Sequence, residues 1–328
     1  MKVIVIGSIN LDTVVNVDHF PAPGETVSGE HSKVMLGGKG LNQAVAAARM
    51  GANVVMVSAV GQDILSTRPW KDLQEESELD LSQVEVLESL PTGQAIVTVD
   101  EAGENTIIIL EGANGAHTPE GVVEQLEVAE RGDILLCQLE VRSNVVKAAL
   151  EEAQKRGVYT ILNAAPAAVI DDLLPFVDLL VVNETEAQIL LQHGDDLAEA
   201  LDECAYNLAQ RFSVDAVVTG GAQGVWWAAH GSHHESSGTT HEIHSGHVSP
   251  YSVEAVDTTG AGDAFVGALA SAIADGKTLT KALEVAAVLG ALACTSLGAQ
   301  GYAARKEDVL KICDRDGSQS ENSGLLNV

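Results

Sequence analysis

Short apolar runs alternate with helical patterns along most of the chain, and this alternation constrains the fold more than any other feature. The runs are continuous and rich in β-branched residues, which is typical of strands covered on both faces. They are Val3–Ile6, Val54–Ala59, Ile134–Leu139, Tyr159–Leu162, Leu179–Val182 and Ala216–Thr219. The helical patterns are Leu41–Met50, Thr118–Ala129, Asn144–Arg156, Glu184–Gln192 and Leu197–Phe212. The alternation predicts right-handed crossovers and a three-layer α/β/α fold around a mostly parallel sheet.

Two stretches break this rhythm. Val14–Leu36 and Gly93–Leu110 alternate as strands do, contain turn signals, and have no helical pattern between their strands. We expect them to form a small extra sheet that stands off the main one. After Gly260 the pattern is almost entirely helical, and the residues from 314 to 328 are rich in Ser, Asn, Gly and Asp. We therefore expect one domain over 1–313 and a flexible tail over 314–328.

Composition and charge exclude several classes of partner. Hydrophobic residues make up 46% of the 328 residues, which is enough for a sizeable core. The 18 Lys and Arg residues against 47 Asp and Glu give a formal net charge of −29, which repels nucleic-acid phosphates and anionic lipid surfaces. The 4 cysteines are scattered, and no apolar run is long enough to span a bilayer. These features predict a cytoplasmic protein that binds neither nucleic acid nor membranes.

Polar residues follow several of the predicted strands. They are Asn10 and Asp12 after the first strand, then Glu140, Asn163, Asn183 with Glu186, and Thr219 with Gly221. Any single one of these residues has a structural alternative, because Asn and Asp cap helices and Gly shapes turns. However, the carboxyl ends of parallel strands meet at one edge of a sheet, where ligands bind. Together the residues predict a polar cleft at that edge.

The segment 255–265 is the most informative for chemistry. Gly260 and Gly262 precede an Ala-rich helical pattern, so backbone N–H groups at the start of that helix can form an anion hole. Asp263 beside such a hole suits a general base that takes a hydroxyl proton during phosphoryl transfer. The alternative is that Asp263 only stabilises the first helical turn electrostatically. The chain has no Gly-x-x-x-x-Gly-Lys-Ser/Thr loop, so this is not a P-loop protein.

Five motifs carry a resemblance to a known family. The chain has Gly-Ser-Ile-Asn-Leu-Asp at 7–12, Gly-Gly-Lys-Gly-Leu-Asn-Gln-Ala at 37–44, Gln-Leu-Glu at 138–140, Asn-Glu-Thr-Glu at 183–186 and Asp-Thr-Thr-Gly-Ala-Gly-Asp at 257–263. With these motifs the chain resembles the ribokinase/PfkB-type family of carbohydrate kinases, in order, from about residue 3 to 301. The resemblance implies a ribokinase-like fold in which the two irregular stretches form a β lid over the sugar.

The resemblance also implies roles for individual residues. Asp263 would be the catalytic base, with Gly260, Ala261 and Gly262 as the anion hole. The sugar would contact Asn10, Asp12, Gly38, Lys39, Asn42, Glu140 and Asp263. ATP would contact Asn183, Glu186, Thr219, Gly221, Gly224 and Gly262. Mg²⁺ would be associated with Glu186, and an activating monovalent cation, K⁺, would be held by Asp257, Thr259 and Gly298.

The activity implied is ATP-dependent phosphorylation of D-ribose at its 5-hydroxyl, in a homodimer formed through the β lid. One alternative is a sibling kinase that acts on deoxyribose, fructose or a nucleoside such as adenosine. A second alternative is a sugar-binding regulator without turnover, against which the intact Asp263 counts. A dinucleotide-dependent oxidoreductase is excluded, because no Gly-x-Gly-x-x-Gly follows the first strand.

Overall fold

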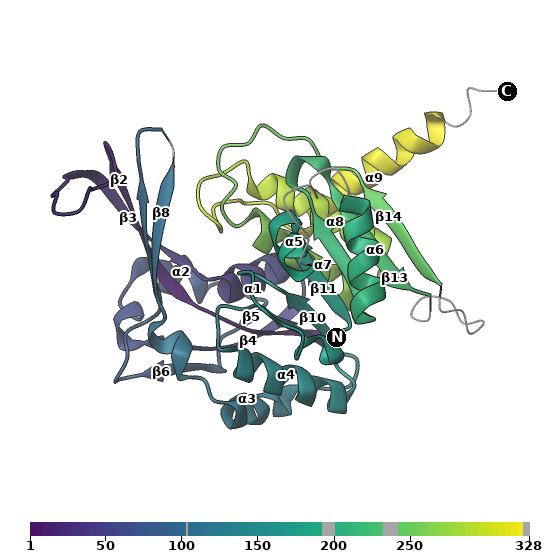
Figure 1. Cartoon of the computed structure of the whole chain (residues 1–328), viewed down its shortest axis with the longest axis horizontal. Helices are drawn as coiled ribbons and strands as arrows, with labels where there is room; N and C mark the ends of the chain where they lie inside the picture. The colour runs from purple at the N-terminus through teal and green to yellow at the C-terminus, as the bar shows by residue number, and fades with distance from the viewer. Residues whose placement is uncertain (103, 192–200, 232–241, 324–328) are drawn as a thin grey trace.

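A large, mostly parallel sheet forms the centre of the molecule (Figure 1). The computed structural model describes residues 1–102, 104–191, 201–231 and 242–323. The strand order is β14-β13-β12-β11-β10-β9-β1-β4-β5, and β6 also pairs with β4. The strands are β1 (Lys2–Ile6), β4 (Asn53–Gly61), β5 (Leu79–Asp80), β6 (Val84–Leu87), β9 (Ile134–Cys137), β10 (Tyr159–Asn163), β11 (Leu179–Asn183), β12 (Asp215–Thr219), β13 (Val225–His230) and β14 (Ile243–Val248). Among the strands in the described ranges, the β12–β13 and β13–β14 pairs are the antiparallel ones of this sheet.

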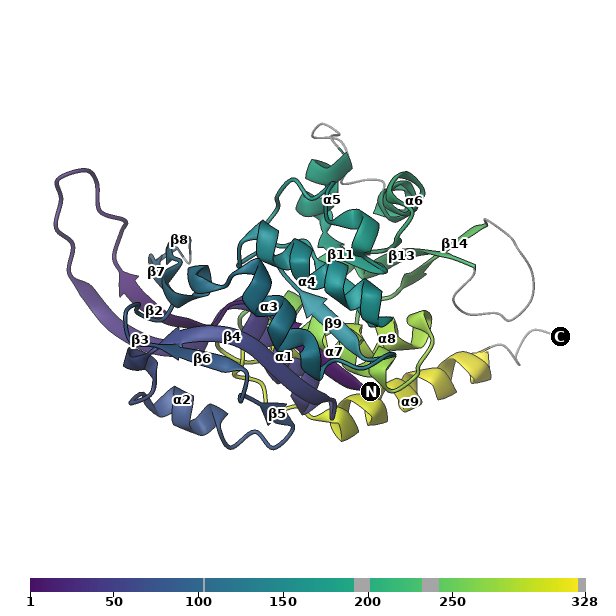
Figure 2. The same cartoon turned by 90° about the horizontal axis from the view of Figure 1, so that it is seen from below.

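Helices cover both faces of the sheet, and the strand sequences explain why. In β1, Val3 and Val5 belong to one buried cluster while Ile4 and Ile6 belong to the other, because successive side chains point to opposite faces. In Figure 2, α4, α5 and α6 lie on one side of the sheet and α8 and α9 on the other. The helices are α1 (Lys39–Arg49), α2 (Arg68–Leu73), α3 (Pro119–Gln125), α4 (Ser143–Arg156), α5 (Glu184–Leu191), α6 (Leu201–Phe212), α7 (Ala261–Ala274), α8 (Leu279–Ala293) and α9 (Lys306–Ser323). The predicted three-layer α/β/α fold is confirmed.

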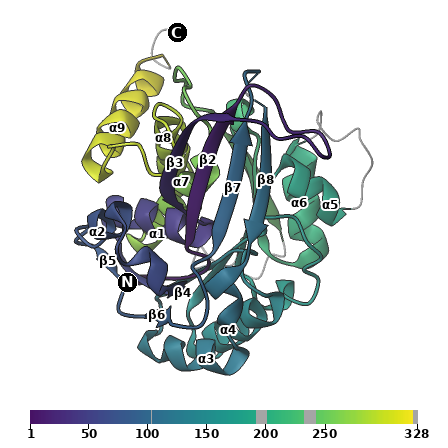
Figure 3. The same ribbon diagram turned by 90° about the vertical axis from the view of Figure 1, so that its left-hand side faces the viewer.

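A second sheet stands beside the carboxyl end of β1 (Figure 3). Its order is β3-β2-β7-β8, with β2 (Asn10–Val17), β3 (Gly29–Gly37), β7 (Gln94–Val99) and β8 (Asn105–Leu110). The sequence predicted this small sheet from 14–36 and 93–110. However, β2 begins at Asn10, so Asn10 and Asp12 lie in the small sheet rather than in a loop after β1. We call this sheet the lid.

Some elements were not predicted from the sequence. The strand β5 has 2 residues, β6 is a half-exposed edge strand, and β14 reads Ile-His-Ser-Gly-His-Val, which has no apolar alternation. The helix α2 has 6 residues and is capped by the Thr67 side chain. At the other end, α9 continues through Ser323, past residue 313 where the sequence analysis ended the domain, and 324–328 lie outside the described residues. Among the described residues, no helix is long and apolar enough to cross a membrane.

Candidate active site

Asp263 lies in the first turn of α7 and is 7% exposed. Both of its carboxylate oxygens accept hydrogen bonds from α1: Asn42 Nδ2 donates to Oδ2 at 3.0 Å, and Gln43 Nε2 donates to Oδ1 at 3.0 Å. Burial raises the pKa of Asp263 above its ordinary value, while the nearby Lys39 and the two amide donors act in the opposite direction. The result is a buried carboxylate that is fixed in orientation and surrounded by polar groups.

The start of α7 is built from glycines. Gly260 has φ 75° and precedes the helix, and a Cβ there would lie 2.4 Å from Ala299 Cβ, so only glycine fits. At Gly262, in contrast, an added Cβ would meet nothing within 4 Å, so open space faces this residue. The N–H groups of a first helical turn have no partner within the helix. The Gly262 and Asp263 N–H groups therefore suit an anion placed in this open space.

Two further side-chain amides, those of Gln138 and Asn163, orient the Gln43 amide that contacts Asp263. Gln138 Nε2 donates to Gln43 Oε1 at 2.7 Å, so the Gln43 amide nitrogen must face Asp263. The same nitrogen also donates to Asn163 Oδ1 at 2.9 Å. Gln138 is fully buried, and its Oε1 has no hydrogen-bond partner among the described residues. The sequence analysis assigned no role to Gln43 or Gln138; the signal was present, since each stands inside a quoted motif and Gln138 follows directly on a buried apolar strand.

The lid strand β2 and the segments after β1 and β9 supply residues that the resemblance predicts to contact the sugar. Asn10 Oδ1 accepts from Asn114 Nδ2 at 2.8 Å, and Asn114 Oδ1 accepts from the backbone N–H of Ile9 at 3.0 Å. Glu140 Oε2 accepts from Ser8 Oγ at 2.5 Å and from the backbone N–H of Lys39 at 2.9 Å. These contacts hold the side chains of Asn10 and Glu140 in place.

The Asp12 carboxyl group has a backbone hydrogen bond with Ala95, which by itself lowers its pKa. Its Oδ1 is buried and has no hydrogen-bond partner among the described residues. Burial, together with the nearby charge of Glu140, raises the pKa of Asp12 to about 6. A Cβ at Gly37, on the neighbouring strand β3, would lie 1.8 Å from Asp12 Oδ2, so the glycine makes room for this carboxylate. An unpaired buried acceptor is costly, and a hydroxyl group of a ligand would satisfy it.

The Gly-Gly turn before α1 carries the remaining two sugar-side positions. Gly38 has φ 91°, and a Cβ there would lie 2.8 Å from the Ser8 carbonyl oxygen. This close approach brings Lys39, the first residue of α1, next to the carboxyl end of β1. Lys39 lowers the pKa of both Asp263 and Glu186 through its charge, which places it between the sugar side and the phosphate side. The structure thus gathers the predicted sugar-side positions around the end of β1.

Asn183 and Glu186 form a reciprocal pair at the start of α5. The backbone N–H of Asn183 donates to Glu186 Oε2 at 2.8 Å, and the backbone N–H of Glu186 donates to Asn183 Oδ1 at 2.8 Å. This is the arrangement of a helix capping box. Glu186 is 8% exposed, and burial raises its pKa, with Lys39 opposing and Asp263 reinforcing the change. The carboxyl group therefore caps a helix and also interacts electrostatically with Lys39 and Asp263.

A glycine turn follows β12. Gly221 has φ 55° and nothing within 4 Å of an added Cβ, whereas a Cβ at Gly224 would lie 2.4 Å from the Val248 carbonyl oxygen. The Gly220 N–H donates to the Gly224 carbonyl at 2.9 Å, which closes the turn. Thr219 Oγ1 donates to the Val182 carbonyl at 3.3 Å. The turn has three glycines at positions 220, 221 and 224, and glycines let a ligand such as a phosphate approach the backbone closely.

Asp257 joins two loops next to α7. Its Oδ1 accepts from the Thr259 N–H at 2.9 Å and its Oδ2 from the Gly298 N–H at 2.8 Å. Burial alone would raise the pKa of Asp257, but these N–H donors lower it overall. A carboxylate and the carbonyl groups of these loops are hard oxygen donors, which fit a monovalent cation. Over the described ranges, no group of three or more His, Cys, Asp or Glu side chains is placed to hold a metal ion.

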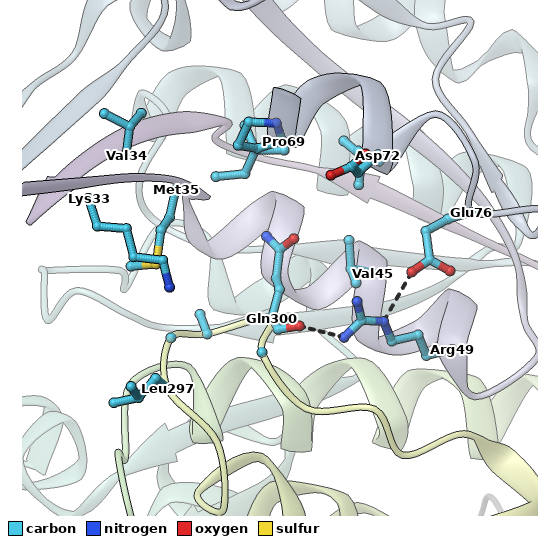
Figure 4. Close-up of a pocket in the computed structure, with 15 residues that line it drawn as sticks. Lys33, Val34, Met35, Val45, Arg49, Pro69, Asp72, Glu76, Leu297 and Gln300 are labelled. Atoms are coloured by element: carbon cyan, nitrogen blue, oxygen red, sulfur yellow. Dashed lines mark hydrogen bonds and ion pairs between the residues drawn. The ribbon is translucent and has the colours of Figure 1, made fainter. Parts of the chain in front are cut away.

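A cavity of about 450 Å³ lies behind α1 (Figure 4). The lid strand β3, the helices α1 and α2, and the loop 297–301 line it. Its lining includes Gly298 and Gln300 but none of Asp12, Glu140 and Asp263. Within the cavity, Arg49 Nε forms an ion pair with Glu76 Oε1 at 3.2 Å. Asn42 and Gln43, which hold Asp263, are not among the residues that line this cavity.

Comparisons with known proteins agree with this geometry. The model of the pfkB family of carbohydrate kinases matches residues 1–305. The chain belongs to this family. It is 35% identical over 316 residues to the ribokinase of Haemophilus influenzae, covering 94% of this chain and 97% of that protein. It is 32% identical over 302 residues to a deoxyribokinase of Salmonella typhi, covering 92% of this chain and 94% of that protein.

A solved structure gives the same result for the fold. The Arabidopsis thaliana ribokinase in complex with ribose and ATP is 27% identical, with a TM-score of 0.80, and the match covers 95% of this chain and 98% of that one. The predictions of a ribokinase-type family member and of its fold are confirmed. The chain is an ATP-using, ribokinase-type carbohydrate kinase. The roles of individual residues remain predictions.

Proposed function

We propose that this kinase transfers the γ-phosphoryl group of ATP to the 5-hydroxyl of D-ribose. The observation that carries the proposal is the placement of Asp263. Its carboxylate lies in the first turn of α7, next to open space at Gly262, and is held by two amides of α1, one of which is the proposed sugar contact Asn42. A hydroxyl group and a phosphoryl group can meet at this point.

The chemical step follows from these positions. Asp263 takes the proton of the 5-hydroxyl, and the hydroxyl oxygen forms a bond to the γ-phosphorus. The bond between that phosphorus and the β,γ-bridging oxygen breaks, and its electron pair leaves with ADP. The N–H groups of Gly262 and Asp263, and the helix end that Gly260 and Ala261 form, stabilise the charge on the transferring group.

Ribose is favoured over sugars with fewer hydroxyl groups. Asp12 and Glu140 are both acceptors on the sugar side, and Asp12 Oδ1 has no protein partner in the part of the chain described. Adjacent hydroxyl groups of ribose would donate to such carboxylates, whereas a deoxy sugar would leave one acceptor unpaired. Asn10, Asn42, Gly38 and Lys39 complete the proposed pocket. The similarity to a deoxyribokinase keeps the sibling activity as the alternative to test.

The proposed nucleotide side uses Asn183, Glu186, Thr219, Gly221 and Gly224. Mg²⁺ prefers oxygen ligands and keeps several waters when it binds with substrate phosphates, so the single carboxylate of Glu186 fits it. Bound there, Mg²⁺ would neutralise phosphate charge. We also assign Asp257, Thr259 and Gly298 to K⁺, for which their oxygen donors are suitable. Both cations remain proposals, as does a cytoplasmic location.

The outer lid strand supports the proposed homodimer. Four consecutive apolar residues of β8, Ile107 to Leu110, are 53%, 58%, 64% and 48% exposed. Such a run is rare on the surface of a monomer and is typical of an interface. Pairing of two lids would cover this run.

The proposal is tested by coupled ADP release with ATP, Mg²⁺ and K⁺ against ribose, 2-deoxyribose, fructose, adenosine and no sugar. We expect turnover with ribose well above that with the others. Turnover that is highest with another of these compounds would overturn the substrate and place the error in the sugar-side residues. Sugar binding without ADP release would favour the non-catalytic regulator.

A further inference from the structure

We propose that Gln300 is a positioning residue that orients Asn42 and, through it, Asp263. This inference rests on the proposed function, because it assigns the orientation of the proposed base. The sequence analysis gave Gln300 no role, and it lies outside the motifs quoted there. It stands in the loop between α8 and α9, far along the chain from α1.

Two hydrogen bonds determine which end of the Asn42 amide faces Asp263. Gln300 Nε2 donates to Asn42 Oδ1 at 2.9 Å, and Asn42 Nδ2 donates to Asp263 Oδ2 at 3.0 Å. A side-chain amide has one acceptor end and one donor end, so a donor on its oxygen fixes where its nitrogen points. Without Gln300, the Asn42 amide could turn and place its oxygen against the Asp263 carboxylate. Gln300 therefore selects the amide orientation that supports the base.

The loop that contains Gln300 is itself attached to α1 through Arg49. The Gln300 carbonyl accepts from Arg49 Nη1 at 2.8 Å (Figure 4). The Tyr302 carbonyl accepts from the same nitrogen at 2.9 Å. Arg49 is at the end of α1, about two helical turns after Asn42 on the same face. Glu76 holds the guanidinium group from the other side, at 3.2 Å from Nε. The loop is thus fastened to α1 at both Asn42 and Arg49.

The same loop is also attached at its other end, at Gly298. The Gly298 N–H donates to Asp257 Oδ2 at 2.8 Å. Asp257 and Gly298 belong to the proposed cation loops, and Gln300 is two residues further on. The loop therefore connects the Asp257 segment to the amide that orients Asp263. A displaced loop would act on the orientation of the base without touching the substrate.

The test uses Gln300→Met, which keeps the length of the side chain and removes the amide. We expect kcat for ribose-dependent ADP release to fall about five- to tenfold, which corresponds to the loss of one hydrogen bond, with KM for ATP unchanged. The control is Leu297→Ala, in the same loop and on the wall of the same cavity, where the side chain is exposed. We expect its kcat to stay within about twofold of wild type.

A double-mutant cycle separates positioning from a structural effect. In an Asn42→Ala background, Gln300→Met has no amide left to orient, so we expect no further loss of kcat. A loss of the same size in both backgrounds would overturn the proposal, and so would unchanged kcat in the single variant. If wild type turns over another sugar of the panel instead of ribose, the cycle is measured with that sugar; the substrate assignment then fails separately.

A second readout needs no turnover. The side-chain amide resonances of Asn42 can be assigned by NMR through their loss in Asn42→Ala. We expect them to shift in Gln300→Met and to remain in place in Leu297→Ala. Asn42 resonances that are identical in Gln300→Met and wild type would contradict the proposal even if the kinase were inactive under the assay conditions.

Discussion

The residues proposed to bind the sugar and those proposed to bind the nucleotide are held in different ways. On the proposed sugar side, side chains from distant segments form hydrogen bonds with one another, as in the Asn42–Asp263 and Asn114–Asn10 contacts. On the nucleotide side, the polar surface consists largely of a glycine turn at 220–224 and of helix ends. Discrimination between sugars depends on fixed donors and acceptors, whereas phosphates are bound well by backbone N–H groups. We therefore expect substitutions on the proposed sugar side to change kcat or KM more than substitutions on the proposed nucleotide side.

The largest effect is expected for Asp263→Asn. The substitution keeps the shape of the side chain and removes the proton acceptor, so kcat should fall about a thousandfold. Ribose binding, measured by calorimetry, should stay within about tenfold of wild type, because the other sugar-side residues are unchanged. A variant with more than about a tenth of the wild-type kcat would contradict the assignment of the base.

The next effect is expected for Asp12→Asn. The substitution replaces a charged acceptor, so KM for ribose should rise about ten- to hundredfold, the range for hydrogen bonds to charged groups. KM for ATP should not change. The matched control is Asp18→Asn, just beyond the end of the same strand, where the side chain is exposed. An unchanged KM for ribose in Asp12→Asn would remove Asp12 from the pocket.

The Asp12→Asn variant should also be more stable than wild type. The pKa of Asp12 is raised from 3.8 to about 6 in the folded protein, so the folded state binds the extra proton between these values. The cost of the buried charge is therefore fully present above pH 6 and disappears as the pH falls toward 3.8. Asp12→Asn should raise the melting temperature by about 2 °C at pH 7.5 and by less at pH 5. A gain of equal size at both pH values would contradict this cause.

The smallest effect is expected on the nucleotide side. Thr219→Ala removes one hydrogen bond to the Val182 carbonyl and leaves the glycine turn intact. KM for ATP should rise no more than about threefold, and KM for ribose should not change. If KM for ATP in Thr219→Ala rose by a larger factor than KM for ribose in Asp12→Asn, a side chain would dominate binding on the proposed nucleotide side, and the expected order of effects would be wrong.

The sequence predicted the fold well where local chemistry decides it. The buried strands such as Val3–Ile6 are β-branched on both faces and could be recognised without their neighbours. The lid was predicted from the alternation in 14–36 and 93–110, although its first strand begins earlier, at Asn10. The strand β14 was missed because its His, Ser and Gly residues pair at a half-exposed edge of the sheet.

The candidate site was predicted only in part. Asn42 and Asp263 stand in recognisable motifs, but nothing in the spacing shows that they bond to each other across 221 residues. Gln300 stands in a glycine-rich loop outside those motifs, and its partner Asn42 is 258 residues away. Such pairs depend on the packing of α1 against α7 and on the path of the loop after α8. Local patterns do not determine either of them.

The most direct test of the account is the position of phosphate in the product. Wild-type protein is incubated with ribose and ATP, and the sugar phosphate is examined by ³¹P and ¹H NMR. If the sugar side presents the 5-hydroxyl to Asp263, the phosphorus should couple to the two protons on carbon 5. Coupling to the single proton on carbon 1, or to another ring position, would contradict the account.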